Sequence, residues 1–362
     1  MKENQMEQSN KYMVSVRCFT YNHAPYIVDA MDGFTKQKTT FPVVTLIVDD
    51  SSTDGEQDII KKYLAEKFQV PYQTEETDDY QLICANHNDN PNCTFVVFLL
   101  KYNHYRIKKS KLPYIAPWND TSKYHALCEG DDYWIAPNKL QAQVSFLESH
   151  PSYVMCHTAI KYYIQEEDRY LESKDININS KIINGGLTAE HILLGYRIQF
   201  CTVLYRQNAI VKARESDSYL FGGNFKMGDT QLWYQLYKEG DIYFYPEICA
   251  IYRKHSGSAT MKTRAYDNLQ FTLSSAELRM YFALRDNLSD AFCKYVQKWY
   301  SQSYIKCLAF NKSLSAKYPV NLKEDRLLYV LYKTHLLKPF LRIYMGIDPW
   351  LSTIKRRITG RM

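Results

Sequence analysis

The sequence predicts an α/β fold, with a mixed, mostly parallel sheet flanked by helices and a helical C-terminal region. Over the first 160 residues, short apolar runs typical of buried strands alternate with segments of helical periodicity. After about residue 265 only the helical pattern continues. Because a single core rarely grows beyond roughly 250 to 300 residues, the 362 residues predict two units, which we place at residues 1–262 and 263–362.

The first two strands and helices follow from composition. The run Met13–Phe19 is rich in β-branched residues and ends at a Tyr-Asn-His-Ala-Pro turn, and a helix with Pro25 in its first turn is expected next. Residues 41–48 form a continuous apolar run, which ends in an acidic and hydroxyl-rich loop before a helix over residues 59–68. This β-α-β-α order predicts parallel strands whose ligands gather beyond their carboxyl ends.

The later elements of the first unit continue this alternation. Residues 71–94 are rich in Asp, Asn and Thr, so a long loop or insertion is expected there. Strands are expected over residues 94–100, 124–128 and 153–158, and a helix is expected to begin at Pro137.

Two acidic pairs follow expected strands and are candidates for ligand binding. Asp131 and Asp132 lie beside a glycine, and adjacent carboxylates in such a loop suit Mg²⁺ or Mn²⁺ that also contacts phosphate oxygens. Asp49 and Asp50 could accept hydrogen bonds from a base N–H or a ribose hydroxyl. Either pair could instead belong to an ordinary turn or helix cap.

Two further residues could take part in chemistry. Asp229 precedes a helical stretch, and it is a candidate general base, although its spacing alone favours a helix cap. His255 lies in a polar loop, where a neutral imidazole could complete a metal site or simply face solvent. The chain contains neither a P-loop nor a Gly-x-Gly-x-x-Gly motif, which argues against a P-loop ATPase and a dinucleotide-dependent dehydrogenase.

Cysteine usage and hydropathy bear on location. The nine cysteines are an odd number and lie mostly in apolar runs, as reduced thiols of a cytosolic protein do. Residues 1–10 are polar and lack the apolar core of a secretory signal, so export is not expected. No uncharged apolar run approaches 20 residues, so no spanning helix is expected.

The net charge of +6 is concentrated near the C-terminus. From Lys333 onward, seven Lys or Arg residues accompany a single acid, Asp348, with aliphatic and aromatic residues between them. This mixture suits an anionic membrane surface. A basic helix packed on its own domain explains it equally well. No nucleic-acid partner is expected.

Five ordered segments resemble motifs of the family-2 glycosyltransferases of GT-A fold. They are Val14–His23, Val48–Asp54, Glu129–Trp134, Gly228–Asp229 and Tyr252–Ser258. The resemblance covers about residues 12–260, and five motifs in the same order are far more specific than any one of them. Residues 71–123 are longer than the common pattern, which limits the match of Asn103.

The resemblance implies a metal-dependent, hexosyltransferase-like enzyme. It would transfer a sugar, with inversion, from a nucleotide diphosphate sugar to an acceptor hydroxyl, with Mg²⁺ or Mn²⁺ as cofactor. The family pattern assigns donor binding to Thr20, Tyr21, Asp50, Asn103 and Asp131, metal binding to Asp132 and His255, and the general base to Asp229. Of these, Asp131 would contact either the ribose or the metal.

The helical tail resembles those of bacterial enzymes that build surface polysaccharides on lipid carriers. A glycan or lipid-linked acceptor is therefore expected, with the enzyme in the cytoplasm or peripheral on the inner face of the membrane. A nucleotidyltransferase is an alternative, but it would show a Gly-rich, basic phosphate loop where this chain has Thr20–His23. A catalytically inactive scaffold is another alternative, against which the retained Asp132 and Asp229 argue.

Overall fold

The computed structural model describes residues 11–257, 265–321 and 325–344. Contacts divide the chain into two units. The first comprises Met1–Leu187, Gly195–Ser216 and Leu232–His255, and the second comprises Thr188–Leu194, Asp217–Gln231 and Ser256–Met362. The expected boundary near residue 262 lies outside the described residues. The second unit also takes in two short earlier segments that the sequence did not indicate.

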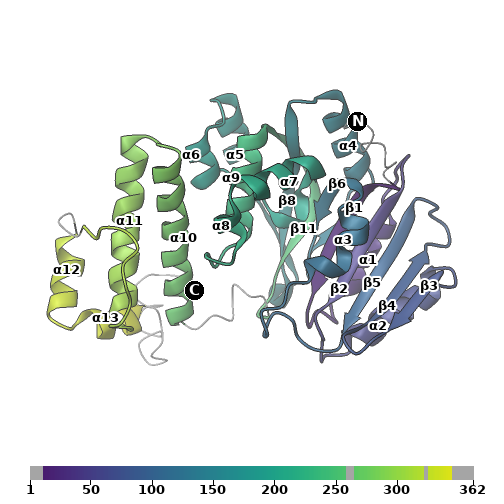
Figure 1. Ribbon diagram of the computed structural model, residues 1–362, viewed down its shortest axis with the longest axis horizontal. Helices are drawn as coiled ribbons and strands as arrows, with labels where there is room; N and C mark the ends of the chain where they lie inside the picture. Colours follow the sequence, from purple (N-terminus) through teal and green to yellow (C-terminus); the bar gives the residue numbers. More distant parts are fainter. Residues whose placement is uncertain (1–10, 258–264, 322–324, 345–362) are drawn as a thin grey trace, which may run out of the picture. The chain divides into compact units, whose positions relative to one another are not determined.

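Eleven strands form one sheet in the described part of the first unit (Figure 1). They are β1 (Tyr12–Thr20), β2 (Val43–Asp49), β3 (Gln73–Glu76), β4 (Tyr80–Asn86), β5 (Cys93–Leu100), β6 (Ser122–Leu127), β7 (Tyr133–Trp134), β8 (Tyr153–Ile164), β9 (Arg169–Glu172), β10 (Leu204–Arg206) and β11 (Asp241–Lys254). Their order is β3-β4-β5-β2-β1-β6-β10-β8-β11-β7, and β9 pairs with β8.

The centre of this sheet is parallel. β1 pairs in parallel with β2 and β6, and β2 pairs in parallel with β5. β4, β10 and β7 pair antiparallel with their neighbours. Every residue of β2 and β5 is buried, as in strands covered on both faces. The structure therefore confirms the predicted α/β fold with a mixed sheet.

Helices flank the sheet (Figure 1). In the first unit they are α1 (Ile27–Thr35), α2 (Glu56–Lys67), α3 (Leu112–Asn119), α4 (Lys139–Ser149), α5 (Asp175–Asn184) and α7 (Gln207–Ser216). Residues of α9 (Asp229–Glu239) belong to both units. The face that α1 buries contains Ile27, Ala30, Met31 and Phe34, as their helical spacing predicts.

The expectation of a loop over residues 71–94 was wrong. β3 and β4 form an antiparallel hairpin, which pairs with β5 through β4. Every residue of β3, which is an edge strand, is exposed, so neither face of this strand is covered. A strand that faces water on both sides can consist of polar residues, so its composition resembles that of a loop.

The second unit is helical in its described residues. It contains α6 (Ala189–Leu193), α8 (Ser218–Phe221), α10 (Ala265–Arg285), α11 (Asp290–Leu308), α12 (Arg326–Lys333) and α13 (Leu337–Tyr344). The Ser289 hydroxyl caps α11 by accepting a hydrogen bond from the Phe292 N–H. The predicted helical character of the C-terminal region is confirmed. None of the described helices is long and apolar enough to cross a membrane.

Candidate functional site

Three loops converge at the carboxyl edge of the parallel strands. They follow β1, β2 and β6, the strands at the centre of the sheet. The Asp50 N–H donates to the Thr20 carbonyl at 2.9 Å, and the Gly130 N–H donates to the Phe19 carbonyl at 3.3 Å. The sequence predicted this meeting of strand ends, because parallel neighbours end at the same edge.

An acidic residue and two histidines converge at this edge. The Asp131 Oδ2 atom lies 3.2 Å from His255 Nε2 and 3.7 Å from His23 Nε2. One ligand atom from each of the three side chains lies within 4.8 Å of the other two, so the group could hold a metal ion. One carboxylate oxygen and two imidazole nitrogens suit Mn²⁺ better than Mg²⁺, which prefers oxygen ligands.

The protonation states in this group are suited to metal binding. Burial lowers the pKa of His23, and the nearby His255 lowers it further, which favours a neutral imidazole. Burial alone would raise the pKa of Asp131, but the hydrogen bond to His255 and the proximity of His23 lower it overall. A neutral imidazole and an ionised carboxylate are the forms in which these groups bind metals.

The side chain of Glu56 controls the orientation of His23 through Thr20. Glu56 is fully buried, and its Oε1 atom accepts a hydrogen bond from the Thr20 hydroxyl. Its Oε2 atom accepts from the His23 N–H at 2.8 Å. His23 Nδ1 lies 3.1 Å from Thr20 Oγ1. Because an ionised carboxylate only accepts, Thr20 donates to Glu56 and can accept from Nδ1–H, which leaves the lone pair of His23 on Nε2.

Gly130 leaves room for this arrangement. A Cβ atom at residue 130 would lie 2.7 Å from the Thr20 Cβ and would also meet the Thr20 hydroxyl. Any larger residue would therefore displace Thr20 from between Glu56 and His23. Close approach to another side chain thus explains why glycine is needed at this position.

We expect Glu56→Gln to weaken Mn²⁺ binding by about 10- to 100-fold, the usual effect of losing a residue that orients a metal ligand. The amide nitrogen can donate to Thr20, whose hydroxyl would then donate to His23 Nδ1 and place the ring proton on Nε2. Electron paramagnetic resonance of unbound Mn²⁺ measures the affinity.

The control is Asp58→Asn, which removes one exposed carboxylate from the same helix. Burial raises the pKa of Glu56 to about 7, so protonated Glu56 at lower pH should resemble glutamine. The affinities of the wild type and the Gln variant should therefore diverge as the pH rises through 7. Equal affinity above that pH would exclude the orienting role of Glu56.

Asp132 lies outside the group formed by His23, Asp131 and His255. Its Oδ1 atom accepts a hydrogen bond from the Arg253 N–H at 2.9 Å, and burial, with the neighbouring Asp131, raises its pKa well above the usual range. The Arg253 guanidinium also donates to the Asp131 carbonyl at 2.9 Å. These bonds hold the end of β11 against the acidic loop. Metal binding by Asp132 stays a prediction.

The side chain of Asp50 is occupied by protein groups. Its Oδ1 atom accepts from the His104 N–H at 2.7 Å, and its Oδ2 atom accepts from the Tyr105 N–H at 3.1 Å and from Lys111 Nζ at 2.8 Å. Asn103 Nδ2 donates to the Asp50 carbonyl at 3.0 Å. In this structure Asp50 and Asn103 thus anchor the segment after β5, and their contact with a donor stays a prediction.

Tyr21 directly follows β1, and Asp49 is the last residue of β2. Tyr21 is half-buried, and its hydroxyl accepts from the Arg106 guanidinium at 3.4 Å. The Asp49 Oδ2 atom is buried and has no hydrogen-bond partner among the described residues, and burial raises the pKa of Asp49. The residue types named Asp49, together with Asp50, as a possible acceptor for a base N–H or a ribose hydroxyl, whereas the family resemblance assigned donor binding to Asp50 only. Its free acceptor atom becomes visible only in the folded structure.

Asp229 belongs to the second unit and begins α9. Its Oδ1 atom accepts a hydrogen bond from the N–H of the next residue, Thr230, at 2.7 Å, whereas a capping side chain accepts from an N–H two or three residues on. Within the same unit, burial lowers the pKa of Arg279 to about 10, while the charge of Asp229 acts to raise it. Asp229 thus stands in the first turn of α9, and its role as general base stays a prediction.

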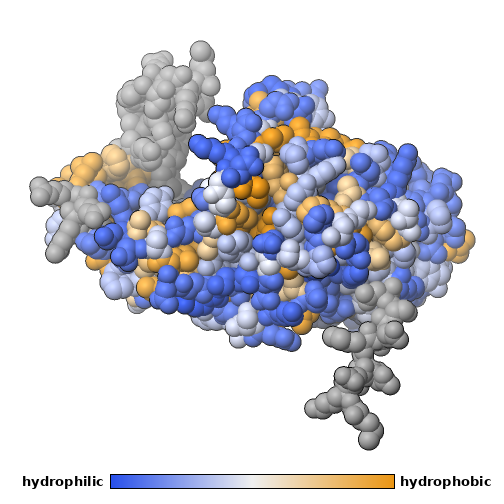
Figure 2. Space-filling view, turned by 90° about the horizontal axis from the view of Figure 1, so that it is seen from above, coloured by the Kyte–Doolittle hydropathy of each residue, from blue (hydrophilic) through white to orange (hydrophobic). Residues whose placement is uncertain are grey.

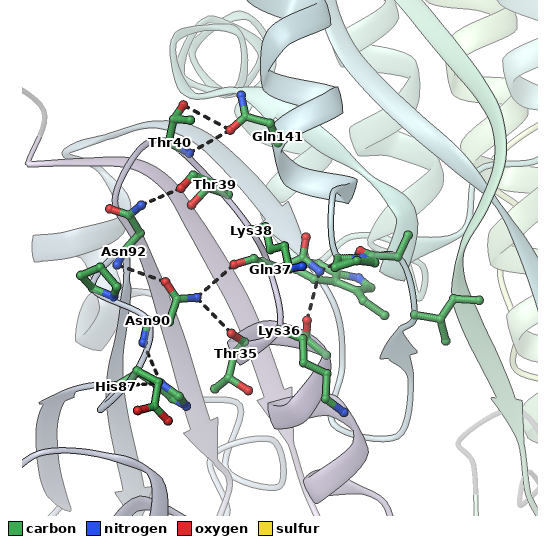
Figure 3. A pocket seen from close by; sticks show the side chains of 17 residues that line it. Thr35, Lys36, Gln37, Lys38, Thr39, Thr40, His87, Asn90, Asn92 and Gln141 are labelled. Carbon is green, nitrogen blue, oxygen red and sulfur yellow. Dashed lines mark hydrogen bonds between the residues drawn. The ribbon is translucent and has the colours of Figure 1, made fainter.

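A cavity of about 900 Å³ lies at the opposite edge of the sheet (Figure 3). The segments before β2 and β5 line it, together with residues that follow β7. Its buried Gln37 donates to the carbonyls of Gly33 and Ala136. Asn90 Nδ2 donates to the carbonyls of Thr35 and Gln37. These amides stabilise loops and are not free to recognise a ligand.

Comparison with known proteins gives relatives of unassigned activity and structures of low identity. No family model matches the sequence. Uncharacterized proteins of Mycobacterium bovis and Mycobacterium tuberculosis are 28% identical over 243 residues, which cover 67% of this chain and 59% of each relative. The chain therefore spans about three-fifths of the length of the curated relatives it matches.

Similar solved structures include TarS of S. aureus, with a TM-score of 0.48 and 15% identity over 92% of this chain and 55% of that chain. The TarS 1–349 structure in complex with UDP has a TM-score of 0.44 and 15% identity over 93% of this chain and 91% of that chain. The mannosyltransferase PcManGT of Pyrobaculum calidifontis, in complex with GDP-Man and Mn²⁺, has a TM-score of 0.45 and 14% identity over 97% of this chain and 88% of that chain.

Proposed function

We propose that this chain is a glycosyltransferase of GT-A fold, similar to family 2, which transfers a sugar from a nucleotide diphosphate sugar to an acceptor hydroxyl. The observation that carries the proposal is the convergence of His23, Asp131 and His255. Each of them comes from a different segment that resembles the family's motifs. These three residues lie at the carboxyl edge of the parallel strands. Open α/β sheets bind nucleotides at that edge.

We propose that His23, Asp131 and His255 hold Mn²⁺ and that Asp229 is the base. When bound there, the ion would supply positive charge that offsets the charge developing on the departing diphosphate. Asp131 contributes the carboxylate, and His23 is oriented for its part by Thr20 and Glu56. Asp229 accepts the proton of the acceptor hydroxyl, which attacks the sugar carbon from the side opposite the diphosphate. Attack from that side inverts the configuration.

Thermal unfolding tests the proposal directly. A ligand that binds only the folded state stabilises it by about 2.7 kcal/mol at about 100 times its Kd. With Mn²⁺ present, one uridine, guanosine or thymidine diphosphate sugar should raise the melting temperature more than the others, and chelation should remove the increase. If no donor in such a panel changes the melting temperature, nucleotide-sugar binding is excluded.

The products separate this proposal from its alternatives. A glycosyltransferase releases a nucleoside diphosphate, a nucleotidyltransferase releases pyrophosphate, and an inactive scaffold releases neither.

We further propose that the acceptor is a glycan or a lipid-linked glycan of a bacterial surface polysaccharide. The enzyme would then work on the cytoplasmic side of the membrane, attached peripherally to it.

A further inference from the structure

The last helices of the second unit combine exposed apolar residues with basic residues. From Arg326 to Tyr344, the sequence contains four Lys or Arg residues and no Asp or Glu. This stretch forms α12 and α13, which meet at His335, a residue in the left-handed region with φ of 62°. Both helices are short, so tertiary packing, such as that of α13 on α11, must stabilise them more than their own backbone bonds do.

The two helices have one packed face and one exposed apolar face. Leu328, Leu337 and Leu341 are buried. The exposed apolar residues are Leu327 at 68%, Val330 at 52%, Leu336 at 56% and Phe340 at 44% exposure. Leu327 and Val330 are three residues apart in α12 and lie on one side of that helix, whereas Leu336 directly precedes α13 and Phe340 lies within it. We call these four residues the exposed apolar set.

Beside these helices lies a cavity of about 930 Å³ with a basic lining. Lys312, Lys333, His335 and Lys338 line it together with Phe310, whose ring lies 5.5 Å from Lys338 Nζ. We call this the basic cavity. Its three lysines form no ion pair with a carboxylate among the residues that the structure describes. An anion is therefore the ligand whose charge complements this cavity.

We propose that this region docks on an anionic phospholipid bilayer, with a lipid phosphate in the basic cavity and the exposed apolar set in contact with the acyl chains. Lysines near an anionic leaflet add attraction, and apolar residues on an amphipathic helix add buried area. An acidic protein surface would complement the lysines but would offer no apolar surface to the exposed apolar set. The proposal does not depend on the glycosyltransferase activity.

Sedimentation of the full chain with vesicles tests the proposal. The chain should sediment with phosphatidylcholine vesicles that contain phosphatidylglycerol and should stay in solution with phosphatidylcholine alone. Replacing Lys312, Lys333 and Lys338 together with alanine should lower the partition coefficient roughly 100-fold, from the usual contribution of a lysine near an anionic surface. Replacing exposed Lys61, Lys212 and Lys294 removes the same charge elsewhere and should change it far less.

One further variant and a measurement with inorganic phosphate distinguish a bilayer from a soluble anion. Replacing Leu327 and Phe340 with serine keeps the charge and should weaken vesicle binding, while circular dichroism should show unchanged helix content. Equal sedimentation of this variant and the wild type would overturn the proposal. So would stabilisation by inorganic phosphate that depends on the three lysines without any binding to anionic vesicles, because the basic cavity would then serve a soluble anion.

Discussion

Replacing Asp131 with asparagine should abolish metal-dependent donor binding and lower Mn²⁺ affinity by more than the roughly 100-fold expected for an orienting residue. Asp131 provides the carboxylate oxygen that faces both His23 and His255. Asparagine keeps the shape of the side chain but removes its negative charge, which the two imidazoles cannot replace. Calorimetric titration with Mn²⁺, followed by titration with the donor, measures both losses.

Asp132→Asn is the matched control for this experiment. It makes the same substitution at the adjacent residue, and the amide oxygen can still accept the hydrogen bond from the Arg253 N–H. If the metal binds His23, Asp131 and His255, the Asp132 variant should keep most of its Mn²⁺ affinity. If Asp132 is instead the ligand, as the family resemblance implies, the Asp132 variant should lose Mn²⁺ affinity and the Asp131 variant should keep most of it. Two variants with equal, undiminished affinity would exclude a metal at this acidic loop.

Much of the first unit could be predicted, because buried strands and helix faces consist mostly of apolar residues. β2 and β5 are buried throughout and consist almost entirely of apolar residues, so their composition identifies them. The helical face of α1 follows from spacing in the same way. The hairpin of β3 and β4 could not be recognised, because an exposed edge strand has no apolar pattern.

The sequence indicated which edge of the sheet holds the candidate site, but not all the side chains that meet there. The acidic loop after β6 and His255 follow from motif order, whereas the contribution of His23 depends on the turn after β1 and on Glu56 at the start of α2. In the sequence, Glu56 looks like an ordinary residue of a first helical turn, where acids are common. Its role depends on a buried contact with Thr20, which no spacing rule predicts.

Replacing Asp229 with asparagine should lower kcat by about 10²- to 10⁴-fold, the usual contribution of a general base. Donor and Mn²⁺ affinities should stay unchanged, because Asp229 is not one of the residues proposed to hold the metal, which are His23, Asp131 and His255. A loss confined to kcat would show that Asp229 acts in the transition state and not in ground-state binding. The measurement is the rate of nucleoside diphosphate release at saturating donor and acceptor.

The choice of asparagine separates catalysis from helix capping. Asp229 accepts a hydrogen bond from the Thr230 N–H, and an asparagine oxygen can accept the same bond, so the start of α9 should keep its stability. Asp290→Asn removes an acid from the equivalent first position of α11 and should leave kcat unchanged. If the Asp229 variant also keeps full activity, Asp229 is only a helix cap and the base must be sought elsewhere. A fall in kcat at an unchanged melting temperature has no explanation in capping, since a cap contributes to stability and does not take the acceptor's proton.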